Sequence, residues 1–413
     1  MVSVIEKVQV VEKLPKGWKW VRLEDVCDQD RQTINPNTPL SASLPYLSLE
    51  HIESNTGRIL REPSESLEDE GLSNTFSFNS QHVLYGKLRP YLNKVALPNF
   101  SGRCTTEAIP LLPKRDVERE YLAWVLRRQE TIDAAMRGKT GSRMPRANIT
   151  ELLSLKIPLP PLPEQKRIVG ILSDRLTAID KARTATETQL KAAKALPAAY
   201  LRQVFDSPEA QKWKRKKLGD IALISGGIQK TPHRFPSSFH RSYLTVRNVQ
   251  RGWLDLSTVE RFEITLGELE RCRLECGDLL IVEGNGSVDH IGRNAIYRGE
   301  PEDCIHQNHL IRVRLDQTKD DPDFLSFYLN SDFGKKQMLE KAMTTTGLHT
   351  LSVSKIQQME APIISLENQR KITLEIKERL LTVTKLERSL QSQLNTINQL
   401  PAATLRQAFN GEL

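Results

Sequence analysis

The sequence lacks the short motifs by which nucleotide-using enzymes hold their cofactors. It has no Gly-x-x-x-x-Gly-Lys-Ser/Thr phosphate loop. Gly284-Asn285-Gly286 lacks the third glycine and the following helical pattern of a dinucleotide site. The Asn-Pro-Pro-Tyr or Asp-Pro-Pro-Tyr tetrapeptide of amino-methyltransferases is absent, and Asn35-Pro36-Asn37 is interpreted as a turn. These absences predict a chain with no catalytic residues and no cofactor of its own, and they disfavour the alternative of a stand-alone enzyme such as a methyltransferase.

Cysteine is scarce and irregularly spaced. The five cysteines are Cys27, Cys104, Cys272, Cys276 and Cys304. An odd number in a large chain argues against a secreted disulfide framework. Cys272-x-x-x-Cys276 with Cys304, and His306-x-x-His309, lack the paired spacing of zinc fingers, so no metal site is expected.

Long apolar runs are also missing. Leu279-Leu280-Ile281-Val282 is among the longer ones, far short of the ~20 residues that a membrane span needs. The first 18 residues carry Glu6, Lys7, Glu12 and Lys13 where a signal peptide would have an apolar block. We therefore expect a cytoplasmic protein without membrane contact.

Positive charge is in mild excess. The 413 residues include 59 Lys and Arg against 51 Asp and Glu, which gives a formal net charge of +8. Such a balance suits a polyanionic partner, because Lys and Arg that neutralise phosphates release counterions. An ordinary basic soluble protein would have the same composition, so the motifs must decide. The length predicts two or more domains.

The strongest pattern is an internal repeat with an offset of 400 − 196 = 204 residues. Leu196-Pro-Ala-Ala-Tyr-Leu-Arg-Gln-Val-Phe205 recurs as Leu400-Pro-Ala-Ala-Thr-Leu-Arg-Gln-Ala-Phe409, with eight of ten positions identical. Gln165-Lys-Arg-Ile168 falls on Gln369-Arg-Lys-Ile372 at the same offset. More weakly, Tyr46-Leu-Ser-Leu49 resembles Tyr243-Leu-Thr-Val246. The repeat predicts a duplication with a pseudo-twofold design, each half being one variable domain followed by one long helix.

Each predicted helix follows a connector. Pro158-Leu-Pro-Pro-Leu-Pro-Glu164 should be extended because proline restrains the backbone, and Glu164 suits the first turn of a helix. Each helix should run about 30 residues, roughly 45 Å, before Pro197 or Pro401.

Apolar residues at seven-residue spacing predict a coiled-coil seam between the two helices, which would pack antiparallel and place the two domains at opposite ends. The alternative is that each helix packs only on its own domain. The expected helix-pair interface comprises Leu172, Leu176, Ile179, Leu190, Ile376, Leu380, Val383, Leu390, Leu394 and Ile397.

The two variable regions contain short apolar runs separated by Gly, Pro, Asn and Ser. These runs predict β-strands at 45–49, 82–85, 278–282 and 294–297, with short helices at 118–128 and 322–329. The expected fold class is α+β, with two mixed α/β domains separated by a pair of long antiparallel coiled-coil helices. The expected parts are residues 1–157 (first variable domain), 158–206 (connector and helix), 207–361 (second variable domain) and 362–413 (C-terminal helix).

Basic and polar residues gather in the predicted turns. Arg pairs with guanine and Asn with adenine in the major groove, whereas Lys holds phosphate. Any one of these residues can be polar simply because loops are wet. As a set, flanked by glycines that allow close backbone approach, they predict nucleic-acid contact. The candidates are Lys87, Arg89, Lys94, Lys139, Arg143, Arg146, His233, Arg234, Arg241, Arg247, Asn285 and Arg293.

Three features together resemble one known family. They are the Pro-Leu-Pro-Pro-Leu-Pro-Glu-Gln stretch ending at Gln165, the repeated Leu-Pro-Ala-Ala-x-Leu-Arg-Gln-x-Phe, and the domain openings at Leu14-Pro-Lys-Gly-Trp18 and at residues 213–221. Over essentially the whole chain they resemble the specificity subunit of type I restriction–modification systems. The second copy departs from the pattern, since Ile363 to Gln369 has lost most of the prolines.

The resemblance implies a non-catalytic, DNA-binding subunit of a phage-defence methyltransferase complex. Each variable domain would be a target recognition domain that reads one half of an interrupted, asymmetric site in double-stranded DNA, and the helices would set the gap. Two methylation subunits, carrying S-adenosylmethionine, would dock on the repeated helices. Restriction subunits using ATP and Mg²⁺ would join them. A scaffold that binds proteins without reading DNA is the competing interpretation.

Overall fold

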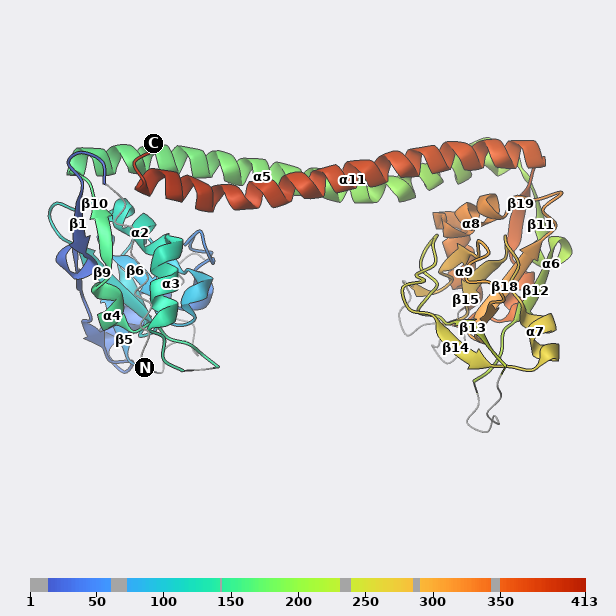
Figure 1. The fold of residues 1–413 in the computed structure, drawn as a ribbon, viewed down its shortest axis with the longest axis horizontal. Helices are drawn as coiled ribbons and strands as arrows, with labels where there is room; N and C mark the ends of the chain where they lie inside the picture. The colour runs from blue at the N-terminus through green and yellow to red at the C-terminus, as the bar shows by residue number, and fades with distance from the viewer. Residues whose placement is uncertain (1–13, 61–72, 142, 231–238, 285–289, 343–349) are drawn as a thin grey trace, which may run out of the picture. The chain divides into compact units, whose positions relative to one another are not determined.

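The computed structural model describes residues 14–60, 73–141, 143–230, 239–284, 290–342 and 350–413 (Figure 1). Contacts divide the chain into two compact units. The first unit comprises Met1–Glu187 together with Ser392–Leu413, and the second comprises Thr188–Gln391. Each unit therefore contains one variable domain and parts of both long helices.

Within its described residues, the first unit contains two four-stranded sheets and a two-stranded ribbon. The first sheet is antiparallel with the order β2-β9-β6-β7, and the second has the order β3-β5-β8-β4, in which only the β4–β8 pair is parallel. The ribbon pairs β1 with β10. The strands are β1 Lys19–Arg22, β2 Cys27–Gln29, β3 Thr33–Ile34, β4 Tyr46–Leu47, β5 Thr75–Phe78, β6 Val83–Gly86, β7 Val95–Ala96, β8 Gly102–Thr105, β9 Ala108–Pro113 and β10 Lys156–Leu159.

The short helices of this unit are α1 Pro39–Ser43, α2 Arg119–Arg127, α3 Gln129–Arg137 and α4 Ile149–Leu153, with 3-10 turns η1 Leu23–Asp25, η2 Leu49–His51 and η3 Pro90–Leu92. Among them, α2 packs against strands β6 and β7 of the first sheet. Helix α2 buries Tyr121, Leu122, Val125 and Leu126, whose spacing places them on one helix face. They join one hydrophobic core with residues of β6 and β9, all of which are nearly inaccessible to solvent.

The second unit repeats this plan. Its sheets have the orders β12-β18-β15-β16 and β14-β13-β17, and its ribbon pairs β11 with β19. The strands are β11 Lys214–Lys217, β12 Ala222–Gly226, β13 His240–Leu244, β14 Glu260–Glu263, β15 Leu279–Val282, β16 Asn294–Ile296, β17 Ile305–His306, β18 Leu310–Leu315 and β19 Glu360–Ile363. The helices are η4 Ala210–Lys212, α6 Leu218–Ile221, α7 Leu266–Cys272, α8 Pro322–Asn330, α9 Asp332–Ala342 and α10 Val353–Gln357.

The expected strands and short helices are confirmed. Strands β4, β6, β15 and β16 fall on the four predicted strand segments, and α2 and α8 fall on the two predicted short helices. The α+β class of both domains is confirmed as well. The ribbons match in register, since Pro158 lies opposite Trp20 and Pro362 lies opposite Arg215. Proline is tolerated there because a two-stranded ribbon leaves one edge of each strand unpaired.

The two long helices are α5 Leu162–Phe205 and α11 Leu366–Phe409, of 44 residues each. At 1.5 Å per residue each is about 66 Å long. The prediction that they end before Pro197 and Pro401 is wrong, because both prolines lie inside the helices. Each proline removes one backbone hydrogen bond. Burial of the next turns offsets this loss, since Leu201, Phe205 and Phe409 all lie in hydrophobic cores.

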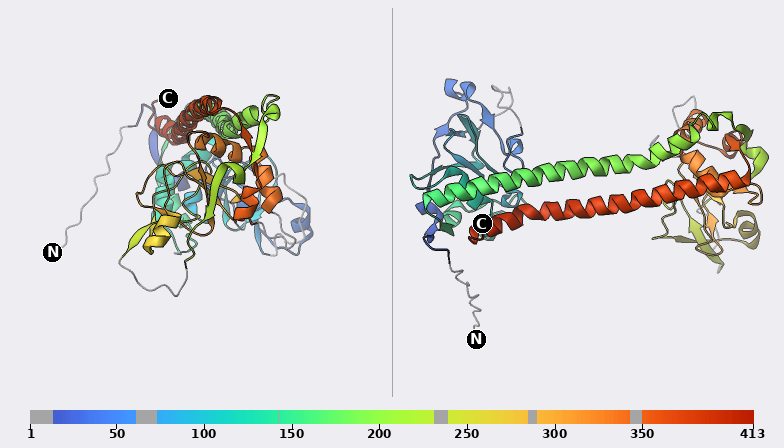
Figure 2. Two further views of the ribbon diagram at one scale, coloured as in Figure 1. Left: turned by 90° about the vertical axis from the view of Figure 1, so that its right-hand side faces the viewer. Right: turned by 90° about the horizontal axis from the view of Figure 1, so that it is seen from above.

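The helices run antiparallel within each unit. In the first unit Arg175 of α5 donates to Gln407 of α11 at 3.4 Å, and in the second Arg379 of α11 donates to Gln203 of α5 at 3.0 Å. The top view in Figure 2 shows the two helices side by side. The interpretation that each helix packs only on its own domain is therefore wrong.

Burial follows the predicted seam. Leu172, Leu190, Ile376, Val383 and Leu390 are buried. The other five predicted positions are half-buried, namely Leu176, Ile179, Leu380, Leu394 and Ile397. The seven-residue spacing thus predicted which helix positions avoid solvent.

Candidate nucleic-acid interface

A repeated glutamine attaches the start of each long helix to its domain. The Gln165 side chain accepts from the Glu118 backbone N–H at 2.8 Å and donates to the carbonyls of Asp116 and Pro160. The Gln369 side chain accepts from the Asp321 N–H at 2.8 Å and donates to the Asp320 carboxylate and the Ile364 carbonyl. Both glutamines are inaccessible to solvent. Glutamine occurs at both positions of the repeat, and in each copy its side chain bonds the start of the long helix to the preceding domain.

The end of each long helix packs on the domain of the other repeat. Phe409, which ends α11, lies against Tyr121 of α2 with ring centroids 5.4 Å apart, and the Arg128 guanidinium stacks on the same phenyl ring. Phe205, which ends α5, lies against Phe324 of α8 at 5.5 Å. The Leu-Pro-Ala-Ala-x-Leu-Arg-Gln-x-Phe repeat therefore ends in an aromatic residue that completes a domain core.

Two loops of the first unit lie side by side and carry the predicted basic residues. We call them the basic loops, residues 86–94 and 138–147. The Arg89 N–H donates to the Pro145 carbonyl at 2.7 Å, and the Ala147 N–H donates to the Lys87 carbonyl at 2.8 Å. Arg89 has a left-handed backbone with φ of 52°. The sequence separates these loops by about fifty residues, yet the structure joins them into one surface.

Charges on the basic loops fall into two groups. Glu107 holds one group, with its carboxylate 2.9 Å from Arg146 Nε and 4.0 Å from Lys87 Nζ. Arg89, Lys139 and Arg143 form the other group and are exposed. An anionic ligand would meet the exposed group first, because the Arg146 and Lys87 charges are partly balanced by Glu107.

Two large apolar side chains lie exposed in the same loops. Tyr91 is 49% exposed and Met144 is 45% exposed. Sequence reasoning did not select them, or Glu107. The available signals were Met144 directly after Arg143 and Tyr91 two residues after Arg89. Nothing in the sequence pairs Glu107 with Arg146.

Lys94 and Arg293 point inward. Lys94 Nζ donates to the Leu49 carbonyl at 2.6 Å, and an Arg293 guanidinium N–H donates to the Val246 carbonyl at 3.3 Å. Burial lowers the pKa of both side chains, and Glu50 partly opposes that shift at Lys94. Both cations therefore stabilise a turn of their own domain, at equivalent places in the two repeats.

The second unit presents fewer of the predicted residues. Arg241 in β13 lies 3.5 Å from Asp303 and stacks on Phe239, whereas Arg247 is exposed. The predictions for His233, Arg234 and Asn285 lie outside the described residues. The Leu351 N–H donates to the Glu283 carbonyl at 2.6 Å, as the Ala147 N–H does to Lys87 in the first unit.

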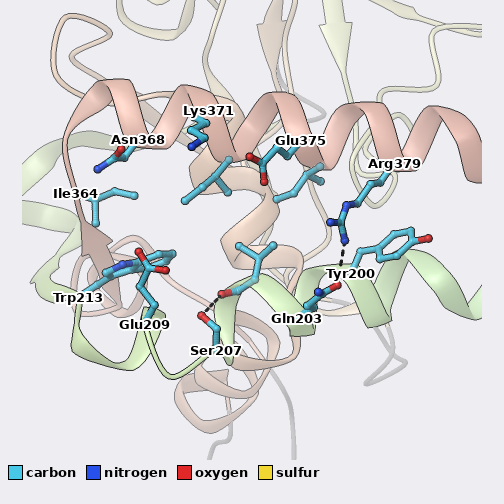
Figure 3. A pocket seen from close by; sticks show the side chains of 13 residues that line it. Tyr200, Gln203, Ser207, Glu209, Trp213, Ile364, Asn368, Lys371, Glu375 and Arg379 are labelled. Carbon is cyan, nitrogen blue, oxygen red and sulfur yellow. Dashed lines mark hydrogen bonds between the residues drawn. The ribbon is translucent and has the colours of Figure 1, made fainter.

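A pocket of about 370 Å³ lies in the second unit between the end of α5 and the start of α11. Figure 3 shows Trp213 and Glu209 on one side and Asn368, Lys371 and Glu375 on the other. Its charged residues have both signs, so it is not a selective anion site. The pocket leaves the helix surface indented where the repeat motif of α5 ends.

Among the described residues, no group of three or more His, Cys, Asp or Glu is arranged to hold a metal ion. Cys272, Cys304 and His306 are buried, and Cys276 is exposed. None of the described helices combines the length and apolar character needed to cross a bilayer.

Comparison with known proteins points to one family. Residues 15–192 match the type I restriction modification DNA specificity domain. The chain is 28% identical over 214 residues to the EcoDI specificity subunit of Escherichia coli, which covers 52% of this chain and 46% of that protein. It is 25% identical over 301 residues to the EcoKI specificity subunit of Escherichia coli K12, covering 68% of this chain and 64% of that protein. These matches thus span about half to two thirds of the curated relatives.

A solved structure shares the fold over nearly the whole chain. It comes from work on complex assembly and conformational transition of the type I R-M system. The TM-score is 0.75 at 23% identity, and the alignment covers 97% of this chain and 100% of that one. The likeness extends across both variable domains and both long helices.

Proposed function

Because the chain belongs to the family of type I restriction–modification specificity subunits, we propose that it reads a bipartite, asymmetric site in double-stranded DNA. Each variable domain, residues 1–157 and 207–361, recognises one half of the site. The helix segments within 158–206 and 362–413 set the gap between the halves.

The observation that carries this proposal is the repetition of contacts, not only of sequence. Gln165 and Gln369 bind equivalent backbone groups, and Phe409 and Phe205 complete equivalent cores. Two domains built on one frame with different loops suit two different half-sites. A protein that recognises one continuous site would need only one such domain.

The basic loops of the first unit supply the expected DNA surface. Arg89, Lys139 and Arg143 are exposed on adjoining backbone segments. Such a cluster neutralises phosphates, and arginine can also bond two acceptors of guanine. In the second unit Arg247 is the exposed candidate, with His233, Arg234 and Asn285 retained from the sequence.

The long helices are proposed to dock two methylation subunits. Leu374 is 61% exposed and Leu381 is 57% exposed, and both lie on α11. They are seven residues apart, and each lies two positions before a buried seam residue, Ile376 or Val383, so they share the helix face turned away from α5. Exposed apolar residues on one stripe suit a protein partner.

Catalysis is assigned to the partners. S-adenosylmethionine belongs on the methylation subunits, and ATP and Mg²⁺ on the restriction subunits. The isolated chain should transfer no methyl group and cut no DNA. Methyl transfer by the purified chain, with partner contamination excluded by mass spectrometry, would contradict this assignment.

The decisive experiment is methylome mapping in a host that carries this chain with its methylation subunit. We expect one interrupted motif with two unlike halves and a fixed gap. A protein scaffold that reads no DNA would leave the motif dependent only on the methylation subunit, so exchanging this chain would not change it.

A further inference from the structure

One turn is built alike in both variable domains. We call it the capped turn, residues 48–51 after β4 and residues 245–248 after β13. The Ser48 N–H donates to Nδ1 of His51 at 3.3 Å. In the second domain the Thr245 N–H donates to Oδ1 of Asn248 at 2.9 Å. A side chain three residues later thus caps the turn in each domain, although one cap is histidine and the other asparagine.

Backbone contacts anchor the far side of the turn in the same way. The Leu60 N–H donates to the His51 carbonyl at 2.8 Å, and the Asp255 N–H donates to the Asn248 carbonyl at 2.7 Å. Bridges follow directly, joining Ile52 to Ile59 and Val249 to Leu254. Both turns therefore lead into a short hairpin with equivalent pairing.

A half-buried cation bonds to the middle of each turn. Lys94 donates to the Leu49 carbonyl and Arg293 donates to the Val246 carbonyl. The residue after each of those carbonyls is exposed. It is Glu50 in the first domain and Arg247 in the second. Three kinds of contact thus hold equivalent turns, and the one outward side chain differs in the sign of its charge.

The turn also adjoins the proposed DNA surface. Lys94 ends the first basic loop, where its carbonyl accepts from the Gly86 N–H at 2.8 Å, and Lys87 and Arg89 lie between these two residues. In the second domain Arg293 directly precedes β16, as Lys94 precedes β7. Glu50 therefore lies on a turn bonded to the end of the first basic loop, and Arg247 lies at the equivalent position of the second domain.

We propose that Glu50 and Arg247 are specificity-determining residues, each reading one base pair of its own half-site from the capped turn. This inference rests on the proposed function. The frame is repeated because both domains need the same approach to the groove, and the outward residue differs because the half-sites differ. Lys94 and Arg293 are positioning residues that hold the turn.

The two side chains select different bases. A carboxylate only accepts hydrogen bonds, so Glu50 suits the N4 amino group of cytosine. A guanidinium only donates, so Arg247 suits the O6 and N7 atoms of guanine. We expect a C·G pair under the first turn and a G·C pair under the second.

The test changes each residue to glutamine, which pairs best with adenine. Glu50→Gln and Arg247→Gln are assembled with the methylation subunit, and bound DNA is selected from libraries randomised one position at a time. Glu24→Gln and Arg271→Gln are matched controls, because Glu24 and Arg271 are exposed on other elements of the same domains.

The expected result is a loss of about tenfold or more in preference for the original base pair at one position, with a shift towards adenine. Glu50→Gln should alter only the first half-site and Arg247→Gln only the second. The controls should keep the wild-type motif. Because selection measures binding, it reports base preference even in a complex whose methylation rate has fallen. Glu50→Ala and Arg247→Ala, which remove the hydrogen-bonding group altogether, should lose the preference at the same positions.

The inference is overturned if both variants select the wild-type bases at every position. The proposed function would survive that result, since the wild-type complex would still select a bipartite motif. It would fail separately if the wild-type complex selected no motif at all. A change spread over several positions in both half-sites would also contradict a reader confined to one turn.

Discussion

Phe409 lies against Tyr121, with ring centroids 5.4 Å apart, although the two residues belong to different copies of the repeat. Phe205 stands in the same relation to Phe324 at 5.5 Å. Each variable domain is thus completed by the helix that follows the other one. Because each domain core contains a phenylalanine from the other copy of the repeat, the packing of each copy depends on the other.

Truncating either phenylalanine should destabilise one unit more than the other. Phe409→Ala should weaken the first unit and Phe205→Ala the second, each by about 3–5 kcal/mol, because a buried aromatic ring is replaced by a cavity. Hydrogen exchange around Tyr121 and Phe324, read in both variants, checks this. The two variants are each other's controls, and equal deprotection of both units in either variant would contradict the assignment.

Removing exposed arginines from the basic loops should weaken DNA binding by the assembled complex. In Arg89→Ala combined with Arg143→Ala, each lost phosphate contact should reduce the slope of log affinity against log salt by about one. Salt titration measures this slope. Arg115→Ala removes an exposed arginine outside these loops and is the control. A double variant with wild-type affinity and slope would remove the loops from the interface.

Arg146→Ala should behave differently from Arg143→Ala. Arg146 is bonded to Glu107, so its loss leaves that carboxylate facing the loop surface. Binding should fall further than one lost phosphate contact explains, because Glu107 would keep only the more distant Lys87, and a partly compensated negative charge repels DNA. Arg146→Ala with Glu107→Gln should recover part of the affinity. If the double variant recovers no affinity, the Glu107 carboxylate is not the cause of the weaker binding of Arg146→Ala.

Exchanging residues 14–157 for the first variable domain of another family member should change only one half of the site. The end of helix α11 keeps its contact with the first domain, provided that the donor domain has an aromatic residue at the position of Tyr121 to pack against Phe409. A methylome of the hybrid reports both halves. New bases in the second half as well would refute the independence of the two domains.

Lengthening both helices should lengthen the gap. Four residues inserted after Thr188 and four after Ser392 occupy equivalent repeat positions, since 188 + 204 = 392, and each insertion adds about 6 Å. Base pairs rise about 3.4 Å each, so the gap should grow by one or two base pairs while both halves stay the same. Insertion in α5 alone is the control and should impair assembly. A matched double insertion with the original gap would show that the docked subunits set it.

Much of the fold follows from the sequence because repetition and periodicity are local signals. The identity of Gln165 with Gln369 located the start of both helices, and the seven-residue spacing from Ile376 to Leu390 located the buried stripe. The predicted helix ends are wrong because proline usually terminates a helix, whereas Pro197 and Pro401 lie inside α5 and α11. The cores that receive Phe205 and Phe409 are tertiary features, and no local pattern announces them.

The site was predicted less completely. Arg89, Lys139 and Arg143 are exposed as expected of a ligand surface, but Lys94 and Arg293 point inward. Composition cannot distinguish a cation that faces solvent from one that holds a carbonyl, since both occur in polar loops. Glu50 is not among the sequence candidates, and an acidic residue does not suit phosphate. The match of Tyr46-Leu-Ser-Leu49 with Tyr243-Leu-Thr-Val246, extended by one residue, pairs Glu50 with Arg247.

The exchanged helix ends also bear on biosynthesis. The second unit lies within Thr188–Gln391, whereas the first requires Ser392–Leu413 in addition to its own early residues. During translation all residues of the second unit are therefore synthesised before those of the first unit are complete. The first domain emerges early from the ribosome yet waits for Phe409, which closes a loop of 409 − 121 = 288 residues onto Tyr121. Until then the part of α2 that Phe409 covers stays exposed to solvent. We expect chaperones to bind this apolar surface in the growing chain.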